Sequence, residues 1–172
     1  MHTILNLLKY DHYRHKQEYK KYWNDKNFVI EAVKINGWFL RYASEQLQND
    51  REIVLMAVKN NGYALVNASK ELRNDREIVL EAVKRIGRAL ENASKELKND
   101  KEIVLKAVKN HGEYLRYASK ELQNDKKCVL IALKKIHFVN YINFKKTNHM
   151  TDESKFLHFY FEKSFSKILE FY

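Results

Sequence analysis

The chain has 172 residues, of which 45% are hydrophobic and 31% are charged, and this balance suits one folded domain and excludes intrinsic disorder. The formal net charge of +10 suggests nucleic acid, but the basic excess lies in residues 1–23 and 124–148, whereas residues 24–123 are close to neutral. A lone cysteine excludes an internal disulfide, every apolar run is too short to span a bilayer, and the first ten residues lack a secretory signal pattern. We therefore expect a cytoplasmic protein.

Four tandem units of 25 residues follow residues 1–23. All four glycines, Gly37, Gly62, Gly87 and Gly112, fall 25 residues apart, and the surrounding residues repeat in register. A fixed period of this length predicts a repeat array.

The second unit, residues 49–73, shows what each unit contains. Asp50 or Asn49 can cap a helix, in which an apolar stripe is formed by Ile53, Val54, Ala57 and Val58. Gly62 is expected to end this helix in a left-handed conformation. Residues 63–73 then predict a second amphipathic helix, with Leu65, Ala68 and Leu72 on its apolar face.

Helices of about ten residues, roughly 15 Å long, are too short to be stable alone, so neighbouring units must share a core. The sequence therefore predicts an all-α fold of tandem two-helix repeats, as either a short α-solenoid or a compact helical array. We expect one domain over residues 1–172, with an N-terminal cap (1–23) and four repeats (24–123).

The last part of the chain departs from the pattern. Residues 124–148 form a degenerate fifth repeat, in which His137 replaces the glycine and Cys128, which takes the column of Ile53, is expected in the core. Residues 149–172 predict an aromatic-rich C-terminal helix. Open-ended arrays need atypical ends, so we interpret both termini as capping elements.

The shared phrase NDxxIVLxAVKxxGxxLxxASxEL resembles a tandem helical repeat of bacteria, protists and large viruses whose function is uncharacterised, and four copies carry its Asn-Asp, Ala-Val-Lys, Gly and Ala-Ser in register. The resemblance covers residues 24–136. It implies an all-helical repeat fold, and it transfers no catalytic residue.

Nothing in the sequence predicts catalysis. We find no nucleophile with a base, no paired carboxylates, no metal-ligand spacing and no glycine-rich phosphate loop. We therefore expect a protein that is not an enzyme, has no cofactor or bound metal and takes no small-molecule substrate.

Positions that differ between otherwise similar units indicate a tailored surface, because uniform packing does not require the differences. Several are aromatic or arginine residues, which commonly anchor protein interfaces. The predicted partner-binding residues are Trp38, Phe39, Arg41, Tyr42, Tyr63, Arg88, Tyr114, Arg116 and Tyr117. Neutral drift on a solvated face is the alternative explanation.

The basic ends give a second hypothesis, because lysines interleaved with aromatics can neutralise phosphates and stack bases. The predicted nucleic-acid-binding residues are Arg14, Lys16, Lys20, Lys21, Lys126, Lys127, Lys134, Lys135, Lys145 and Lys146. Aromatics that seal the ends of the array, with lysines that solvate them, would explain the same pattern.

Two function classes follow. The first, which we prefer, is a non-enzymatic repeat protein that binds, and thereby inhibits or scaffolds, a protein partner. The second is a binder of RNA or single-stranded nucleic acid. The two merge in one concrete version, a phage-encoded inhibitor of an RNA-guided nucleoprotein defence complex, which rests on analogy of size and composition.

Overall fold

A computed structural model describes residues 20–146 of the chain, and the side chains of residues 20–136. Each of the four repeats begins with a regular helix of ten residues, and a longer helix begins the fifth. These helices are α2 (Lys26–Ile35), α4 (Arg51–Asn60), α5 (Arg76–Arg85), α6 (Lys101–Asn110) and α8 (Lys126–Lys146). Residues 20–146 contain no strand, so the described part is all-α. Most of the expected N-terminal cap and all of the expected helix over 149–172 lie outside it.

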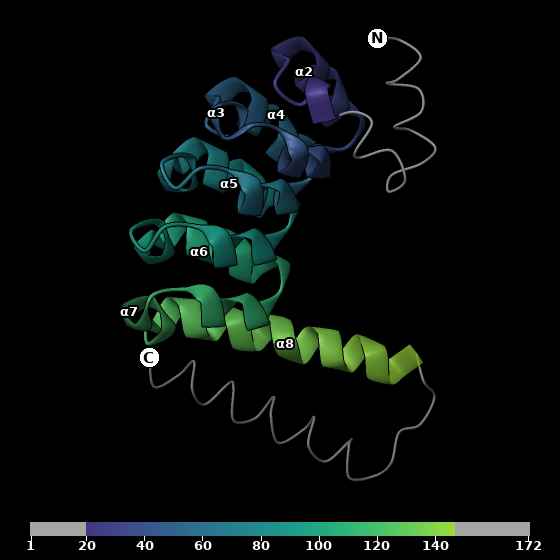
Figure 1. The fold of residues 1–172 in the computed structure, drawn as a ribbon. Helices are drawn as coiled ribbons and strands as arrows, with labels where there is room; N and C mark the ends of the chain where they lie inside the picture. Colours follow the sequence, from purple (N-terminus) through teal and green to yellow (C-terminus); the bar gives the residue numbers. More distant parts are fainter. Residues whose placement is uncertain (1–19, 147–172) are drawn as a thin grey trace.

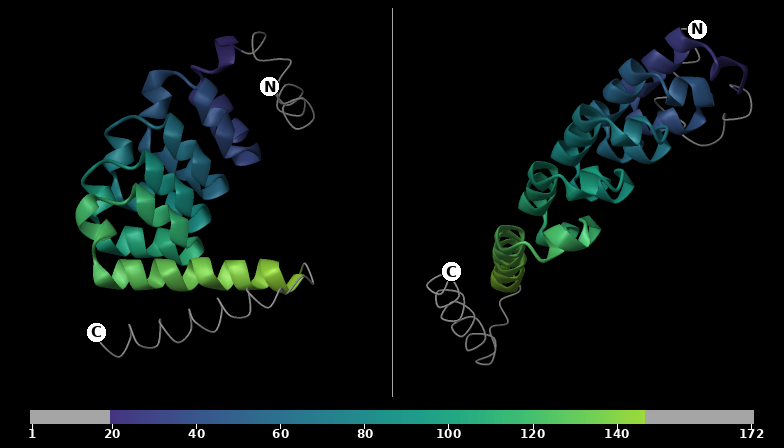
Figure 2. Two further views of the ribbon diagram at one scale, coloured as in Figure 1. Left: turned by 90° about the horizontal axis from the view of Figure 1, so that it is seen from below. Right: turned by 90° about the vertical axis from the view of Figure 1, so that its left-hand side faces the viewer.

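The α-helices lie side by side in chain order, each in contact with the next (Figure 1). A second row runs beside them and consists of the 3-10 helices η2 (Gly37–Tyr42), η3 (Gly62–Asn67), η5 (Gly87–Asn92) and η7 (Gly112–Tyr117). Short elements complete each turn of the chain: η1 (Lys20–Tyr22), α3 (Glu45–Gln48), η4 (Leu72–Asn74), η6 (Leu97–Asn99) and α7 (Lys120–Gln123). Figure 2 shows an elongated stack, so the described repeats form an open array rather than a compact bundle.

A second helical segment follows the first helix of each unit, as predicted, but it is not the continuous helix expected over residues 63–73 of the second unit. The chain instead forms the 3-10 helix η3, with i to i+3 bonds such as Ala64 N–H to Asn61 O, and then turns at Ala68, whose backbone is extended. The Ser69 N–H that follows donates to Gln48 O of the preceding unit at 3.1 Å. This bond between units fixes the break, and the chain then forms the short η4.

The predicted left-handed glycine is also wrong. Asn61, with an extended backbone, ends α4, and Gly62 is the first residue of η3. A Cβ on Gly62 would lie 2.5 Å from the carbonyl oxygen of Ala82 in α5 of the next unit. Glycine is required here because the units approach each other closely.

The predicted core columns are confirmed. Ile53, Val54, Ala57 and Val58 are fully buried, as are their equivalents in the third and fourth repeats. Cys128, in the column of Ile53, is likewise fully buried, and burial raises the pKa of its thiol to about 11. It therefore behaves as a small core residue rather than a reactive thiol.

Aspartate, rather than the asparagine before it, caps the α-helix that begins each repeat and also links neighbouring units. The carboxylate of Asp75 accepts from the Ile78 N–H at 3.1 Å, and Arg51 of the preceding unit contacts its other oxygen at 2.8 Å. The same pairing joins Lys26 to Asp50, Arg76 to Asp100 and Lys101 to Asp125. Backbone and ion-pair contacts therefore fix the spacing of the units, and the row of aspartates is explained by structure.

Candidate partner-binding surface

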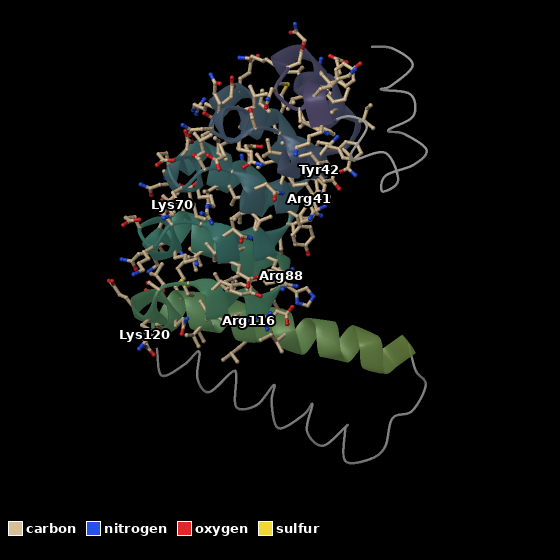
Figure 3. All side chains as sticks on the ribbon, viewed as in Figure 1. Arg41, Tyr42, Lys70, Arg88, Arg116 and Lys120 are labelled. Carbon is tan, nitrogen blue, oxygen red and sulfur yellow. The ribbon has the colours of Figure 1, made fainter. Side chains whose placement is uncertain are left out.

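The positions that vary between repeats gather on one edge of the array. We call this edge the 3-10 surface, and we define it by eleven of the exposed and half-buried side chains on the four 3-10 helices: Trp38, Arg41, Tyr42, Tyr63, Val66, Arg88, Glu91, Glu113, Tyr114, Arg116 and Tyr117. In Figure 3, Arg41, Tyr42, Arg88 and Arg116 lie along this edge, and Lys70 and Lys120 lie on the opposite edge. The 3-10 helices contact one another in succession, so the surface is continuous from one repeat to the next.

The N-terminal end of the 3-10 surface is organised around Arg41. Its guanidinium lies 5.3 Å from the ring centroid of Trp38 and 5.4 Å from that of Tyr42. Tyr42 is half-buried, and its ring lies 5.3 Å from that of the core residue Trp23. Arg41 is therefore held over two aromatic rings, and one of them, that of Tyr42, packs against the core.

Phe39 does not belong to this surface. It is only 2% exposed and packs near Trp23 and Tyr42 in the core at the start of the array. Its prediction as a partner-binding residue is corrected for that reason, since a partner cannot reach a buried ring. Ala64 and Ala89, its equivalents in the second and third repeats, are also fully buried.

The middle of the surface is formed by η3 and η5. Tyr63 and Val66 are 39% and 42% exposed, which is unusual for large apolar side chains in the described part of the chain. Arg88 pairs with Glu91 at 3.1 Å, and the hydrogen bond from Arg88 holds the pKa of that carboxyl below its usual range. Glu91 therefore stays charged and compensates the charge of Arg88.

The C-terminal end of the surface is formed by η7. The rings of Tyr114 and Tyr117 stack with centroids 6.2 Å apart, and Arg116 lies over Tyr117 at 4.8 Å while also donating to its hydroxyl at 2.7 Å. A Cβ on Gly87 would lie 2.7 Å from the Tyr114 ring, so that ring rests directly on η5. Burial raises the pKa of Tyr114, which keeps its hydroxyl neutral.

Taken together, the described 3-10 surface has mixed and nearly balanced charge. Arg41, Arg88 and Arg116 are exposed, and Glu91 and Glu113 lie beside the latter two. Such a surface offers large rings and arginines but no continuous positive field.

The predicted nucleic-acid residues are not brought together. Lys20 and Lys21 are exposed at one end of the stack, whereas Lys126, Lys127 and Lys134 are exposed on α8 at the other, with Lys135 half-buried (Figure 1). Arg14 and Lys16 lie outside the described residues, as do the side chains of Lys145 and Lys146. The described basic residues therefore form two separate groups.

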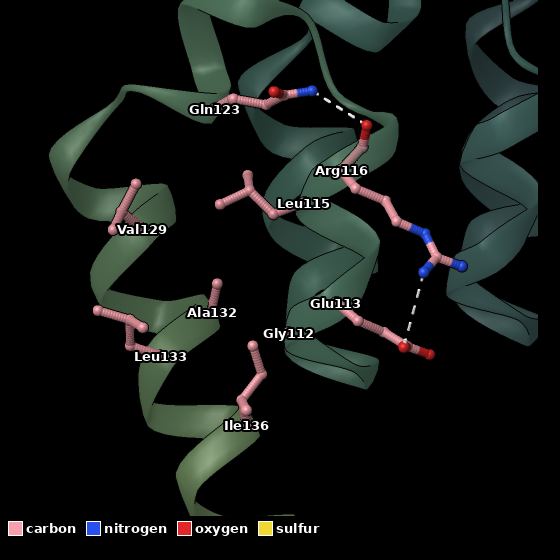
Figure 4. Close-up of a pocket in the computed structure, with 9 residues that line it drawn as sticks. All are labelled: Gly112, Glu113, Leu115, Arg116, Gln123, Val129, Ala132, Leu133 and Ile136. Carbon is pink, nitrogen blue, oxygen red and sulfur yellow. Dashed lines mark hydrogen bonds and ion pairs between the residues drawn. The ribbon is translucent and has the colours of Figure 1, made fainter.

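Sequence reasoning missed one feature at the C-terminal end of the array. A groove of about 290 Å³ lies between η7 and α8, and Figure 4 shows Leu115, Val129, Leu133 and Ile136 around it. Gly112, Glu113, Arg116, Gln123 and Ala132 complete its lining. In the sequence, this feature was indicated by the loss of the repeat pattern at His137, which replaces the glycine of the earlier units.

Over residues 20–146, no helix is long and apolar enough to cross a membrane. Within that range, no three His, Cys, Asp or Glu side chains gather closely enough to bind a metal ion.

Comparison with known proteins identifies the family of the repeats. The family model described as Domain of unknown function (DUF4116) matches four overlapping segments, residues 25–73, 52–98, 75–122 and 100–144. No curated protein and no solved structure matches the chain significantly. The matched segments cover well over half of the chain and coincide with the structural repeats, so the chain belongs to the DUF4116 family of tandem helical repeats.

Proposed function

We propose that this chain is a non-enzymatic binding protein that uses the 3-10 surface to hold a protein partner, which it inhibits or scaffolds. The observation that carries the proposal is the exposed series of aromatic and arginine side chains along one continuous row of helices. The positions concerned vary between repeats, whereas the core columns beside them are nearly identical.

The organisation of these side chains supports the proposal. Arg41 and Arg116 are already placed over aromatic rings, so less conformational entropy is lost when a partner immobilises them. Tyr63 presents a large aromatic ring that is 39% exposed. Preorganised rings and guanidinium groups are typical of the few residues that dominate binding energy at protein interfaces.

The charge of the surface favours protein over nucleic acid. A nucleic-acid site neutralises phosphates with unpaired cations, and binding then weakens steeply with salt. Here Arg88 pairs with Glu91, and Arg116 lies 3.9 Å from Glu113. These carboxylates would repel a phosphate backbone, whereas a protein partner can match both signs.

The test is an affinity pull-down from the native cell lysate, with and without nuclease. The variant combines Tyr63→Ala, Arg88→Ala and Arg116→Ala, three exposed residues whose removal leaves the core intact. The matched control, Lys70→Ala with Lys120→Ala, also removes two positive charges, but from the opposite edge (Figure 3). We expect one specific protein to be retained by the wild type and the control after nuclease, and lost from the variant.

The opposite pattern of binding would contradict the proposal. If nuclease releases everything and the triple variant binds as the wild type does, the 3-10 surface is not the site. Circular dichroism of each variant shows whether a loss of binding reflects a loss of fold. The ion pairs that are removed are exposed, and exposed pairs contribute little to stability, so folding should persist.

A further inference from the structure

The groove between η7 and α8 is an uncovered part of the repeat core. In the first three repeats the equivalent leucines, Leu40, Leu65 and Leu90, are fully buried. Leu115, in the same column of η7, is only partly buried, and Ile136 of α8 is 39% exposed beside it. The groove therefore exposes a column that every earlier unit covers.

The missing cover has a structural cause. Each of η2, η3 and η5 contacts the 3-10 helix of the following repeat. The fifth unit has His137 in place of glycine, and α8 continues as a regular helix to Lys146, where earlier units turn into a 3-10 helix. In the described part of the chain no 3-10 helix follows η7, and the groove occupies the place that such a helix would fill.

We propose that residues 152–172 of the same chain dock into this groove and replace the missing element. These residues follow α8 after a short connection, and the sequence places apolar residues at the spacing of one helix face: Leu157, Phe161, Phe165 and Ile168. An apolar stripe of this kind matches an apolar groove lined by leucine, valine and isoleucine. The groove shares Glu113 and Arg116 with the 3-10 surface, but the proposal does not require a partner on that surface.

The length of this segment fits the groove. The 21 residues of α8 span about 31 Å, and residues 152–172 would span the same length as a helix. Ile136 and Val129 lie about 15 Å and 26 Å back along α8 from Lys146, so a segment that reverses direction after Lys146 reaches both. Residues 147–151 are sufficient for the reversal, since connections between antiparallel helices commonly need about 2–8 residues.

A segment of the same chain is favoured over a second copy. A short connection gives the tethered segment an effective concentration on the order of millimolar, which a separate molecule reaches only in concentrated solution. Docking would also remove the apolar side chains of both groove and segment from water.

Thiol labelling of the full chain tests this proposal. Ile136→Cys places a thiol at the exposed side of the groove, and the native Cys128 stays silent because it is fully buried. We expect this thiol to be labelled at least about tenfold more slowly in the otherwise native chain than in a chain that also carries Phe161→Ser, Phe165→Ser and Ile168→Ser. A Lys70→Cys thiol, on the opposite edge of the array, should react equally fast in both backgrounds.

Two outcomes would overturn the proposal. If the Ile136→Cys thiol reacts as fast as the Lys70→Cys thiol when residues 152–172 are native, the groove is open. If its protection disappears on dilution, a second copy covers the groove instead. If Ile136→Cys disturbs folding, hydrogen exchange of residues 129–136 tests the docking instead. It is compared between the native chain and the triple serine variant, both without added cysteines, and equal exchange in the two contradicts docking.

Discussion

Replacement of Gly62 distinguishes between two explanations for the repeated glycine, which are close packing of adjacent units and a left-handed turn. A Cβ at this position would lie 2.5 Å from the Ala82 carbonyl oxygen, 3.2 Å from the Arg85 Cβ and 3.3 Å from the Ile86 nitrogen. Ordinary contact begins at 3.4 Å, so the backbones of two adjacent units would have to separate by about 0.9 Å. Overpacking of this kind costs about 1–3 kcal/mol, and we expect Gly62→Ala to lose that much stability.

Gly62→Asn is the decisive companion variant. Asparagine is tolerated in the left-handed conformation, whereas the close approach to Ala82 excludes any side chain. Urea denaturation followed by circular dichroism should therefore show Gly62→Asn to be at least as destabilised as Gly62→Ala, with Tyr63→Ala as an exposed neighbouring control. The account is refuted at this point if Gly62→Asn stays within about 0.5 kcal/mol of the wild type while Gly62→Ala does not.

Three further predictions follow from the repeated contacts. Asp75→Ala removes the N-cap of α5 and the partner of Arg51, so we expect the unfolding free energy measured by urea denaturation to fall by about 1–2 kcal/mol. Asp75→Asn keeps a capping side chain and should lose less, and equal losses would contradict the capping role. The hydrogen bond from Lys101 lowers the pKa of Asp125 from its usual 3.8 to about 2, so the ionised Asp125 stabilises the fold fully above about pH 4 and loses this effect as the pH falls toward 2. The unfolding free energy of the wild type, measured as a function of pH, should therefore fall over this window, and Asp125→Asn should remove part of the fall. Ile78→Ala opens a cavity in the fully buried column and should lower the unfolding free energy by about 2–5 kcal/mol, whereas Lys70→Ala on the surface should change it by less than about 0.5 kcal/mol. A small effect of Ile78→Ala would contradict the shared core.

The sequence was sufficient to predict the features that depend on one unit alone. The period, the start of the ten-residue helices after the Asn-Asp pair and the buried column of Ile53 and its equivalents are all confirmed. Each follows from local rules, because aspartate caps a helix and a 3.6-residue stripe faces the core. The core position of Cys128 followed from alignment to the same column.

Features that depend on contacts between units were not predictable in this way. Leu65, Ala68 and Leu72 have the spacing of one helix face, yet the bond from Ser69 to Gln48 of the preceding unit breaks the helix between them. Gly62 likewise responds to Ala82, which lies in the following unit. A local pattern contains no information on these distances, so the tertiary structure overrode both predictions.

The candidate site was partly predictable for the same reason. Variation between repeats identified Arg41, Tyr63, Arg88 and Arg116 as exposed positions. It also selected Phe39, which varies because the first repeat is adjacent to Trp23 and needs a larger side chain to fill the core there. Variation alone does not distinguish a tailored surface from core packing at the end of an array.

Site-specific photo-cross-linking in the native cell tests the proposed function most directly. A photoreactive aromatic residue would replace Tyr63 on the 3-10 surface or, as a control, Lys70 on the opposite edge. We predict a discrete, nuclease-resistant protein adduct from position 63 and none from position 70. An adduct from position 70 alone, or an adduct from position 63 that nuclease removes, would contradict the claim that the 3-10 surface holds a protein partner.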